Sequence, residues 1–318
     1  MTQHRAASPG QLATIGILMP GDMGHGCAMA FRQHGLRVVT CIAGRSANTA
    51  SLAAKAGIET LPSLADVVSE ADLILSILPP EYARDQAQQI AAVMQDTGHF
   101  PDYADCNAVA PATVQSIAAV FDGTTANFID AGIIGLNPVT ENGRTRLYVS
   151  GPDTGLIKQL DGRGMVVRDL GPEIGRASAM KMIYASSTKG AFSLYAAVAV
   201  MAELSGLREA LFAEFAESRP ATLTSIETMV PRIPLDAKRW IFEMEEIART
   251  YESYGMTPAF HQGASAIMQV AANTPLAAET RATARGDQDL AAVLQQYIDA
   301  LELGALDIDA LDIDALGK

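Results

Sequence analysis

Short apolar runs alternate with helical patterns over the first half of the chain. The apolar runs occupy residues 12–18, 36–43, 71–79, 101–107 and 126–135, and helical patterns separate them. Strands that alternate with helices form a parallel sheet with helices on both faces, so this order predicts a doubly wound α/β domain. Two later runs, 146–151 and 164–171, are expected to extend the far edge of the sheet.

The residues after 171 carry helical patterns only. An alanine-rich stretch at 173–206 is expected to form one long helix that joins two domains, and further helical patterns follow at 234–255 and 258–273. A chain of 318 residues is long enough for two domains. We therefore expect an α/β domain at 1–170, an all-helical domain at 171–300, and a frayed tail at 301–318, where a short acidic unit repeats.

The charge balance restricts the partners of the chain. Acidic residues outnumber basic ones by 36 to 23, and the formal net charge is −13, so we expect neither nucleic acid nor an acidic membrane as partner. Cys27, Cys41 and Cys106 are too few and too scattered for a disulfide framework or a zinc motif, and no metal site is expected. No signal peptide and no run of about 18 apolar residues is found, which favours a cytoplasmic protein.

The turn after the first predicted strand comes close to the dinucleotide-binding fingerprint G-x-G-x-x-G. Its six positions hold Met19, Pro20, Gly21, Asp22, Met23 and Gly24, so only the first glycine is missing. The two glycines present let a pyrophosphate approach the backbone and let the helix pack close to the strand. We expect Pro20 to set the turn and to push Met19 into an extended conformation. A glycine-rich turn without a ligand is the alternative.

The end of the second predicted strand indicates which dinucleotide would bind. NAD-specific domains usually carry an acidic residue there for the ribose hydroxyl. This chain has Gly44, Arg45 and Ser46 instead, and a guanidinium beside a hydroxyl suits a 2′-phosphate. The segment therefore predicts NADP, as NADPH, rather than NAD. The alternative is that Arg45 is a solvated loop residue.

Four further segments resemble the 3-hydroxyacid dehydrogenases related to 6-phosphogluconate dehydrogenase. "ADLILSILPP" (71–80) and "YADCNAVAPAT" (103–113) resemble the family's segments around the nicotinamide, "FIDAGIIGLNP" (128–138) resembles its substrate loop, and "GPEIGRASAMKM" (171–182) resembles its lysine motif. From Lys181 onward the chain also resembles a subgroup of phosphogluconate-dehydrogenase-like proteins with a helical C-terminal domain of unassigned function. The resemblance implies a Rossmann-type NADP-binding domain followed by a helical domain for substrate binding and dimerisation.

The resemblance also implies site residues. Lys181 matches the catalytic lysine of the family. Further cofactor contacts fall on Leu78, Pro79 and Asn107, and substrate contacts fall on Asp130, Gly132, Ile133, Ile134 and Gly135. The chain departs from the family at Tyr184, where an asparagine is usual, and at Ile134-Gly135-Leu136, which replace Ser-Gly-Gly. These departures leave the substrate open.

A lysine suits proton transfer because burial and nearby positive charge lower its pKa toward neutrality. On a helix Ser178, Lys181, Tyr184 and Lys189 share roughly one face. We interpret Lys181, Tyr184 and Lys189 as candidate catalytic residues if this face meets the cofactor, and as an ordinary polar stripe if it meets solvent.

Several other residues keep two interpretations. Asn107 either contacts the cofactor or is a turn residue, and Asp130 either orients the substrate loop or satisfies local N–H groups. His261 is either a substrate contact or structural. The remaining polar candidates are expected to be core or solvated face, namely Arg239, Trp240, Glu243 and Glu246.

Together these expectations describe an NADPH-dependent oxidoreductase. It would transfer a hydride between nicotinamide and a small hydroxy or keto acid, with a lysine as general acid and base. An imine reductase-like enzyme acting on C=N bonds and a non-catalytic NADPH-binding protein are the alternatives. Because a long apolar helix needs covering, we also expect a homodimer through the helical domain.

Overall fold

The computed structural model describes residues 10–140, 144–279 and 289–308. It divides into two compact units, Met1–Tyr184 and Ala185–Lys318. The boundary lies after Tyr184 rather than after residue 170 because the helix α6 (Arg176–Ala185) packs on the sheet of the first unit. At this contact a Cβ on Gly132 would lie only 2.9 Å from the carbonyl oxygen of Ala177.

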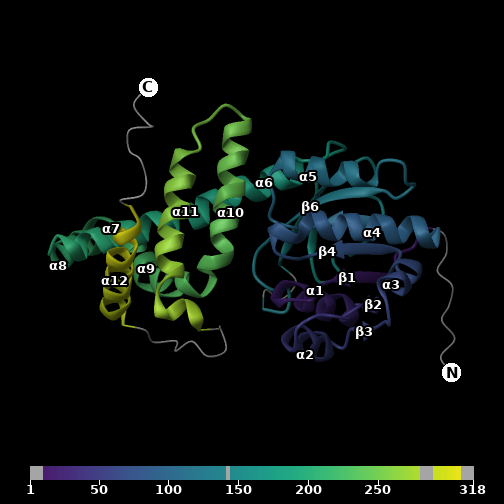
Figure 1. Cartoon of the computed structure of the whole chain (residues 1–318), viewed down its shortest axis with the longest axis horizontal. Helices are drawn as coiled ribbons and strands as arrows, with labels where there is room; N and C mark the ends of the chain where they lie inside the picture. The colour runs from purple at the N-terminus through teal and green to yellow at the C-terminus, as the bar shows by residue number, and fades with distance from the viewer. Residues whose placement is uncertain (1–9, 141–143, 280–288, 309–318) are drawn as a thin grey trace. The chain divides into compact units, whose positions relative to one another are not determined.

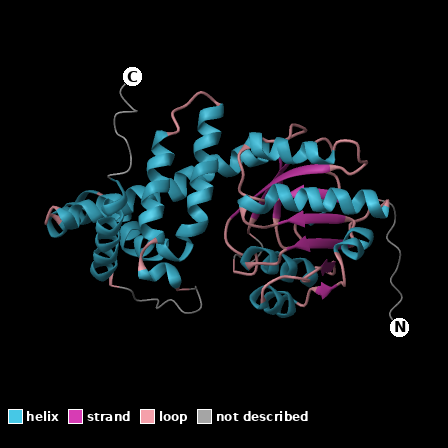
Figure 2. Cartoon of the chain, viewed as in Figure 1, coloured by secondary structure: helices cyan, strands magenta, loops and turns pink. Residues whose placement is uncertain are grey.

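The first unit is built on one eight-stranded sheet (Figures 1 and 2). Its order is β3-β2-β1-β4-β5-β6-β7-β8, and every neighbouring pair is parallel except β6 and β7. That exception corrects the expectation of a purely parallel sheet, and its cause is the connection between β6 and β7, which contains no helix among its described residues. The strands are β1 (Thr14–Leu18), β2 (Arg37–Thr40), β3 (Glu59–Thr60), β4 (Leu73–Ser76), β5 (Asp102–Asp105), β6 (Phe128–Ile134), β7 (Arg146–Ser150) and β8 (Val166–Asp169).

Helices cover both faces of this sheet (Figure 2). Strand β4 shows the division, because Leu73 and Leu75 join one core cluster and Ile74 joins the other. The first cluster includes Phe31 of helix α1, and the second includes Met94 of helix α4. The helices are α1 (Asp22–Gln33), α2 (Ala47–Ala56), α3 (Leu64–Glu70), α4 (Ala83–Thr97), α5 (Pro111–Ala118) and α6. The α/β fold predicted from the sequence is confirmed.

The second unit is helical. The predicted long helix occurs as α6, a π-helical turn at Ser186–Gly190, and α7 (Ala191–Leu204). It is followed by α8 (Arg208–Ser218), α9 (Pro220–Met229), α10 (Ile233–Ser253), α11 (Ala259–Ala272) and α12 (Leu290–Ile308). Helix α12 continues to Ile308, so the predicted frayed tail does not begin at residue 301. The rest of the predicted tail, residues 309–318, lies outside the described residues.

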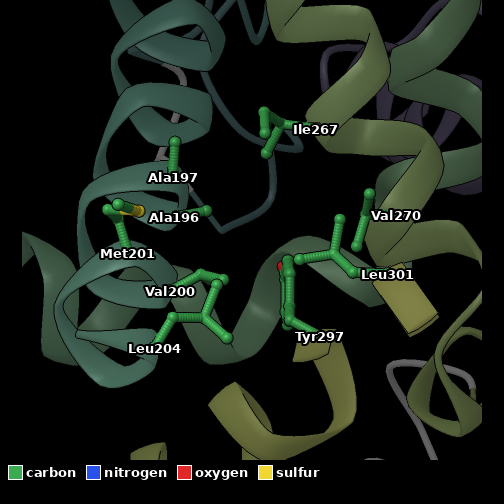
Figure 3. A pocket seen from close by; sticks show the side chains of 9 residues that line it. All are labelled: Ala196, Ala197, Val200, Met201, Leu204, Ile267, Val270, Tyr297 and Leu301. Carbon is green, nitrogen blue, oxygen red and sulfur yellow. The ribbon is translucent and has the colours of Figure 1, made fainter. Parts of the chain in front are cut away.

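Helices α10 and α11 lie side by side in this unit (Figure 1). A mostly apolar groove of about 180 Å³ opens between α7, α11 and α12 (Figure 3). Its lining includes Val200, Ile267 and Leu301, and the hydroxyl of Tyr297 is buried there with no hydrogen-bond partner among the described residues. In the described part of the chain, no helix combines the length and apolarity that a membrane crossing needs.

Candidate functional site

The turn after β1 has an unusual backbone at its first position. Met19 has a φ of +51°, in the left-handed region, so the expected extended conformation was wrong. The amide of Gly21 donates to the carbonyl of Met19 at 2.7 Å, which closes a three-residue turn with Pro20 at its centre. The first fingerprint position therefore needs the left-handed conformation that glycine adopts easily, and this chain places methionine in it.

Helix α1 begins directly after this turn. Its N-cap residue, Gly21, offers no side-chain cap, and a Cβ on Gly24 would meet Ile17 of β1 at 3.4 Å, an ordinary van der Waals contact. Residues Asp22, Met23 and Gly24 form the first turn, whose backbone N–H groups and dipole favour a phosphate. The predicted phosphate-binding turn thus has the required backbone form.

Asn137 holds the start of this helix from the loop after β6. Its amide nitrogen donates to the carbonyl of Asp22 at 2.9 Å, and its amide oxygen accepts from the backbone N–H of Val139 at 3.0 Å. The side chain lies against Gly26, where a Cβ would come within 2.1 Å of the amide atoms. Sequence reasoning missed Asn137.

The loop after β2 carries the predicted 2′-phosphate residues. Gly44 has a φ of +71°, and the hydroxyl of Ser46 caps α2 by accepting from the amide of Thr49 at 3.2 Å. Arg45 is half-buried, and its Nη2 donates to the side-chain oxygen of Gln86 at 2.9 Å. Arg45 is therefore held in place rather than loosely solvated.

Asn107 connects the carboxyl ends of β4 and β5. Its amide oxygen accepts from the backbone N–H of Leu78 at 2.8 Å, and its amide nitrogen donates to Ser76 at 3.1 Å. It also donates to the carboxylate of Asp105 at 3.0 Å. Pro79 follows Leu78 as the N-cap of the next turn, so Asn107 fixes the edge where ligands of such sheets bind.

Asp105 is a buried carboxyl that sequence reasoning missed. Burial raises its pKa to about 7, and hydrogen bonds from Asn107 oppose that rise. The register pairs Asp105 with Asp130 on the neighbouring strand, and the charge of Asp130 adds to the rise. The sequence signal that could have found Asp105 is an acidic residue inside a short strand.

Asp130 caps the helix that carries Lys181. Its carboxylate accepts from the backbone N–H groups of Gly175, Ala177 and Ser178 at 2.8, 3.0 and 3.1 Å, and from the hydroxyls of Ser178 and Ser150 at 2.6 and 3.0 Å. Burial raises the pKa of Asp130, against the lowering effect of these hydrogen bonds. Of its two interpretations, the geometry favours the satisfaction of N–H groups over the orientation of the substrate loop, because a helix N-terminus presents several unpaired donors.

Lys181 lies on α6 over the end of β6. Its Nζ donates to the carbonyl of Ile133 at 2.6 Å, and a Cβ on Gly132 would lie 3.0 Å from the Cβ of Lys181. Ile133 and Ile134 are both buried, so neither presents its side chain to a substrate. Gly135 is exposed and has a φ of +122°.

Two members of the predicted polar face differ sharply in exposure. Tyr184 is 40% exposed, whereas Ser178 is buried against Asp130. The part of this face that belongs to the first unit therefore runs from a buried anchor at Ser178 to the surface at Tyr184.

Lys189 and His261 both lie in the second unit. Lys189 pairs with Glu243, which is 2% exposed, and its Nζ lies 5.7 Å from the ring centre of Trp240. His261 packs on Tyr251 with ring centres 4.3 Å apart, and burial lowers its pKa. Its Nδ1 has no hydrogen-bond partner among the described residues. These contacts give both side chains structural partners inside the helical unit.

The ion pairs of α10 extend around Glu243. Glu243 also accepts from Arg239 at 2.8 Å, and Glu246 pairs with Arg249. Both glutamates are buried, so of the two expected environments, core and solvated face, they lie in the core. Glu243 and Glu246 are three residues apart on one helix and lie near Trp240 in the sequence. This spacing was the sequence signal that both could share a buried face. In the described part of the chain, no set of three or more potential ligands could hold a metal ion.

Comparison with known proteins agrees with this geometry. A family model described as the NAD binding domain of 6-phosphogluconate dehydrogenase matches residues 11–159, and DUF1932, a domain of unknown function, matches residues 202–270. Over most of its length the first unit matches the NAD-binding domain of 6-phosphogluconate dehydrogenase. The family resemblance predicted from the sequence is thereby confirmed, including the helical domain of unassigned function.

Relatives of this NAD-binding chain extend over both units. An uncharacterized 28.5 kDa protein of Methanothermus fervidus is 25% identical over 245 residues, which are 77% of this chain and 93% of the relative. A second relative is the solved structure of a conserved protein of unknown function, described as structurally similar to 3-hydroxyacid dehydrogenases. It is 26% identical to this chain with a TM-score of 0.60, and the match covers 81% of this chain and 96% of the relative.

A third comparison shows the fold alone. A 3-hydroxyisobutyrate dehydrogenase of Mycobacterium tuberculosis, solved with L-serine, is 19% identical with a TM-score of 0.62, over 89% of this chain and 98% of that one. Together the NAD-binding domain and the shared fold support an NAD(P)-dependent oxidoreductase.

Proposed function

We propose that the chain is an NADPH-dependent oxidoreductase that interconverts a small hydroxy acid and its keto acid, with Lys181 as general acid and base. The observation that carries this proposal is the placement of Lys181. Its amine meets the carbonyl of Ile133 at the carboxyl end of β6, the edge at which ligands of doubly wound sheets bind. Lys181 would thus be a positioned proton donor at the edge where the nicotinamide is proposed to bind.

The residues present fit a nicotinamide dinucleotide. The first turn of α1, after Gly21, would hold the diphosphate, and Arg45 would hold the 2′-phosphate. The edge fixed by Asn107 and Leu78 would support the nicotinamide end. When bound, the nicotinamide supplies or accepts the hydride.

The protein's own contribution is proton management. For reduction, the protonated ammonium group of Lys181 would donate a proton to the oxygen of the substrate carbonyl and become a neutral amine, and for oxidation the neutral amine would accept the hydroxyl proton. The carbonyl of Ile133 orients the amine, and the cap by Asp130 fixes the helix beneath it. Tyr184 lies one turn further along α6 and is proposed as a hydrogen-bond partner of the substrate.

Replacing Lys181 with methionine tests the mechanism. We expect kcat to fall by about 10²- to 10⁴-fold, the usual contribution of general acid–base catalysis, while NADPH affinity stays within about twofold. Turnover is followed by NADPH absorbance on a panel of hydroxy acids, keto acids and cyclic imines. Unchanged turnover in Lys181→Met would overturn the role of the lysine, and activity on imines alone would identify a C=N reductase instead.

We also propose that the chain forms a homodimer through the helical unit. The support is the apolar groove of Figure 3 together with exposed apolar side chains on α7, where Met201 and Leu204 are more than half exposed. Large exposed apolar patches mark interaction sites. Replacing Met201 with glutamate should convert a dimer to a monomer in light-scattering measurements, and a wild-type protein that is already monomeric would contradict the proposal.

A further inference from the structure

Gln86 is a buried polar residue that the proposed chemistry does not use. It lies on the second turn of α4 and is only 4% exposed. Its side-chain oxygen accepts from Nη2 of Arg45 at 2.9 Å, and its amide nitrogen lies 3.4 Å from the side-chain oxygen of Gln89. Burying an amide costs free energy unless its hydrogen bonds are made. The contact therefore fixes Arg45 from a separate element of the first unit.

The partner of Arg45 is neutral, and this matters for an anionic ligand. Arg37, the first residue of β2, gives a contrast with Arg45. It forms ion pairs with the carboxylates of Glu59 and Glu70 at 2.7 and 2.6 Å. No such ion pair is found for Arg45 in the part of the chain that the structure describes. An amide partner orients the guanidinium and leaves its positive charge in place. A carboxylate partner would orient the guanidinium and also neutralise its charge.

The position of Arg45 in the chain fits a 2′-phosphate. Arg45 comes directly before Ser46, the N-cap of α2, in the loop that follows β2. In dinucleotide-binding folds the residue at the end of the second strand meets the adenosine ribose. One Nη2 donor of Arg45 is used by Gln86, and the guanidinium has further N–H donors for a phosphate.

We infer that Gln86 is a specificity-determining residue that positions Arg45 for the 2′-phosphate of NADPH and leaves its charge uncompensated. The inference rests on the proposed NADPH preference, and it assigns that preference to a pair of residues on two elements. Gln86 acts through Arg45, so its effect should appear in the choice of nucleotide rather than in hydride transfer.

The test is a comparison of three variants of the full chain by titration of NADPH and NADH at fixed ionic strength. Gln86→Glu should lower the ratio of NADPH to NADH affinity by about tenfold or more, because the new carboxylate pairs with Arg45 and repels the phosphate. Gln86→Met keeps the volume but removes the acceptor, and it should lower the ratio less. Gln88→Glu adds the same charge at an exposed site of α4 and should leave the ratio within about twofold.

A double variant separates this role from a merely structural one. If Gln86 acts through Arg45, then Gln86→Glu should have no further effect on the ratio in an Arg45→Met background. The inference is overturned if the ratio of Gln86→Glu equals that of the wild type, or if it falls equally in both backgrounds. Should Gln86→Glu fail to fold, an unchanged ratio in Gln86→Met would overturn it as well. A wild-type ratio near one would instead contradict the NADPH preference itself.

Discussion

The hydroxyl of Ser178 donates a hydrogen bond of 2.6 Å to the carboxylate of Asp130, and three backbone N–H groups at the start of α6 converge on the same carboxylate. This one side chain therefore attaches the helix of Lys181 to the strand β6. Because β6 also supplies the carbonyl that holds the lysine amine, strand and helix position the lysine from two sides.

Replacing Asp130 with asparagine should loosen this attachment. An asparagine places an NH₂ group against donors that already point at it, so we expect a loss of about 2–3 kcal/mol of unfolding free energy. Ser178→Ala removes one donor only and should cost about 1 kcal/mol. Urea denaturation of the two variants measures the difference, and an Asp130→Asn protein as stable as the wild type would contradict the capping role.

Gly132 allows the close approach of α6 to β6. In Gly132→Ala the new Cβ would lie 2.9 Å from the carbonyl of Ala177 and 3.0 Å from the Cβ of Lys181, so the helix must shift. We expect a loss of about 1–3 kcal/mol in stability and a fall in kcat larger than the change in NADPH affinity. The matched control is Gly263→Ala on α11, which has open space and should gain up to about 1 kcal/mol. Equal effects of the two substitutions would refute this account.

The sequence was sufficient for the alternation of strands and helices, because buried strands leave apolar runs and helices leave periodic ones. It was insufficient where an element is too short for a pattern, as for β3 with two residues and α3 with seven. It also could not show that β7 runs antiparallel to β6, since pairing direction depends on the path of the connection.

The candidate site divides in a similar way. Gly21, Gly24 and Lys181 were found because a turn or a motif places them at a fixed spacing. Gln86 and Asn137 were missed because each acts across more than 40 residues of sequence on a partner that only folding brings near. The conformation of Met19 was mispredicted because the rule for residues before proline was applied where the strand end demands a left-handed turn.

Met19 offers a direct test of that turn. A left-handed conformation costs an ordinary residue about 1–2 kcal/mol, glycine very little, and a β-branched residue more. We expect Met19→Gly to keep NADPH affinity and Met19→Ile to lower both thermal stability and NADPH affinity. Calorimetric titration and thermal melting of this pair provide the comparison. If isoleucine is tolerated as well as glycine, the turn does not have the conformation described.

The raised pKa of Asp105 predicts a pH dependence of stability. Its ordinary value is 3.8 and its value in the folded protein is about 7, so between these limits the folded state holds more protons than the unfolded state. Stability from this group is therefore present at low pH and declines as the pH rises toward 7. Between about pH 4 and 7, the unfolding free energy of Asp105→Asn should therefore fall less with rising pH than that of the wild type. Urea titrations at several pH values test this, and parallel profiles would disprove it.

Lys189 was a candidate for catalysis, and its pairing with Glu243 leads to a different expectation. Lys189→Met would leave Glu243, which is 2% exposed, with Arg239 as its remaining ion-pair partner among the described residues, so we expect a loss of about 3 kcal/mol in stability. Replacing both residues, as Lys189→Met with Glu243→Leu, removes the buried charge together with its partner and should restore most of that loss.

The double variant also decides whether Lys189 takes part in the reaction. A folded double variant that keeps its turnover shows that the lysine serves the packing of α10 against the π-helical turn. A folded double variant that loses turnover while it still binds NADPH would return Lys189 to the catalytic residues. The stability measurement and the rate measurement together are needed, because the single variant lowers activity through unfolding in either case.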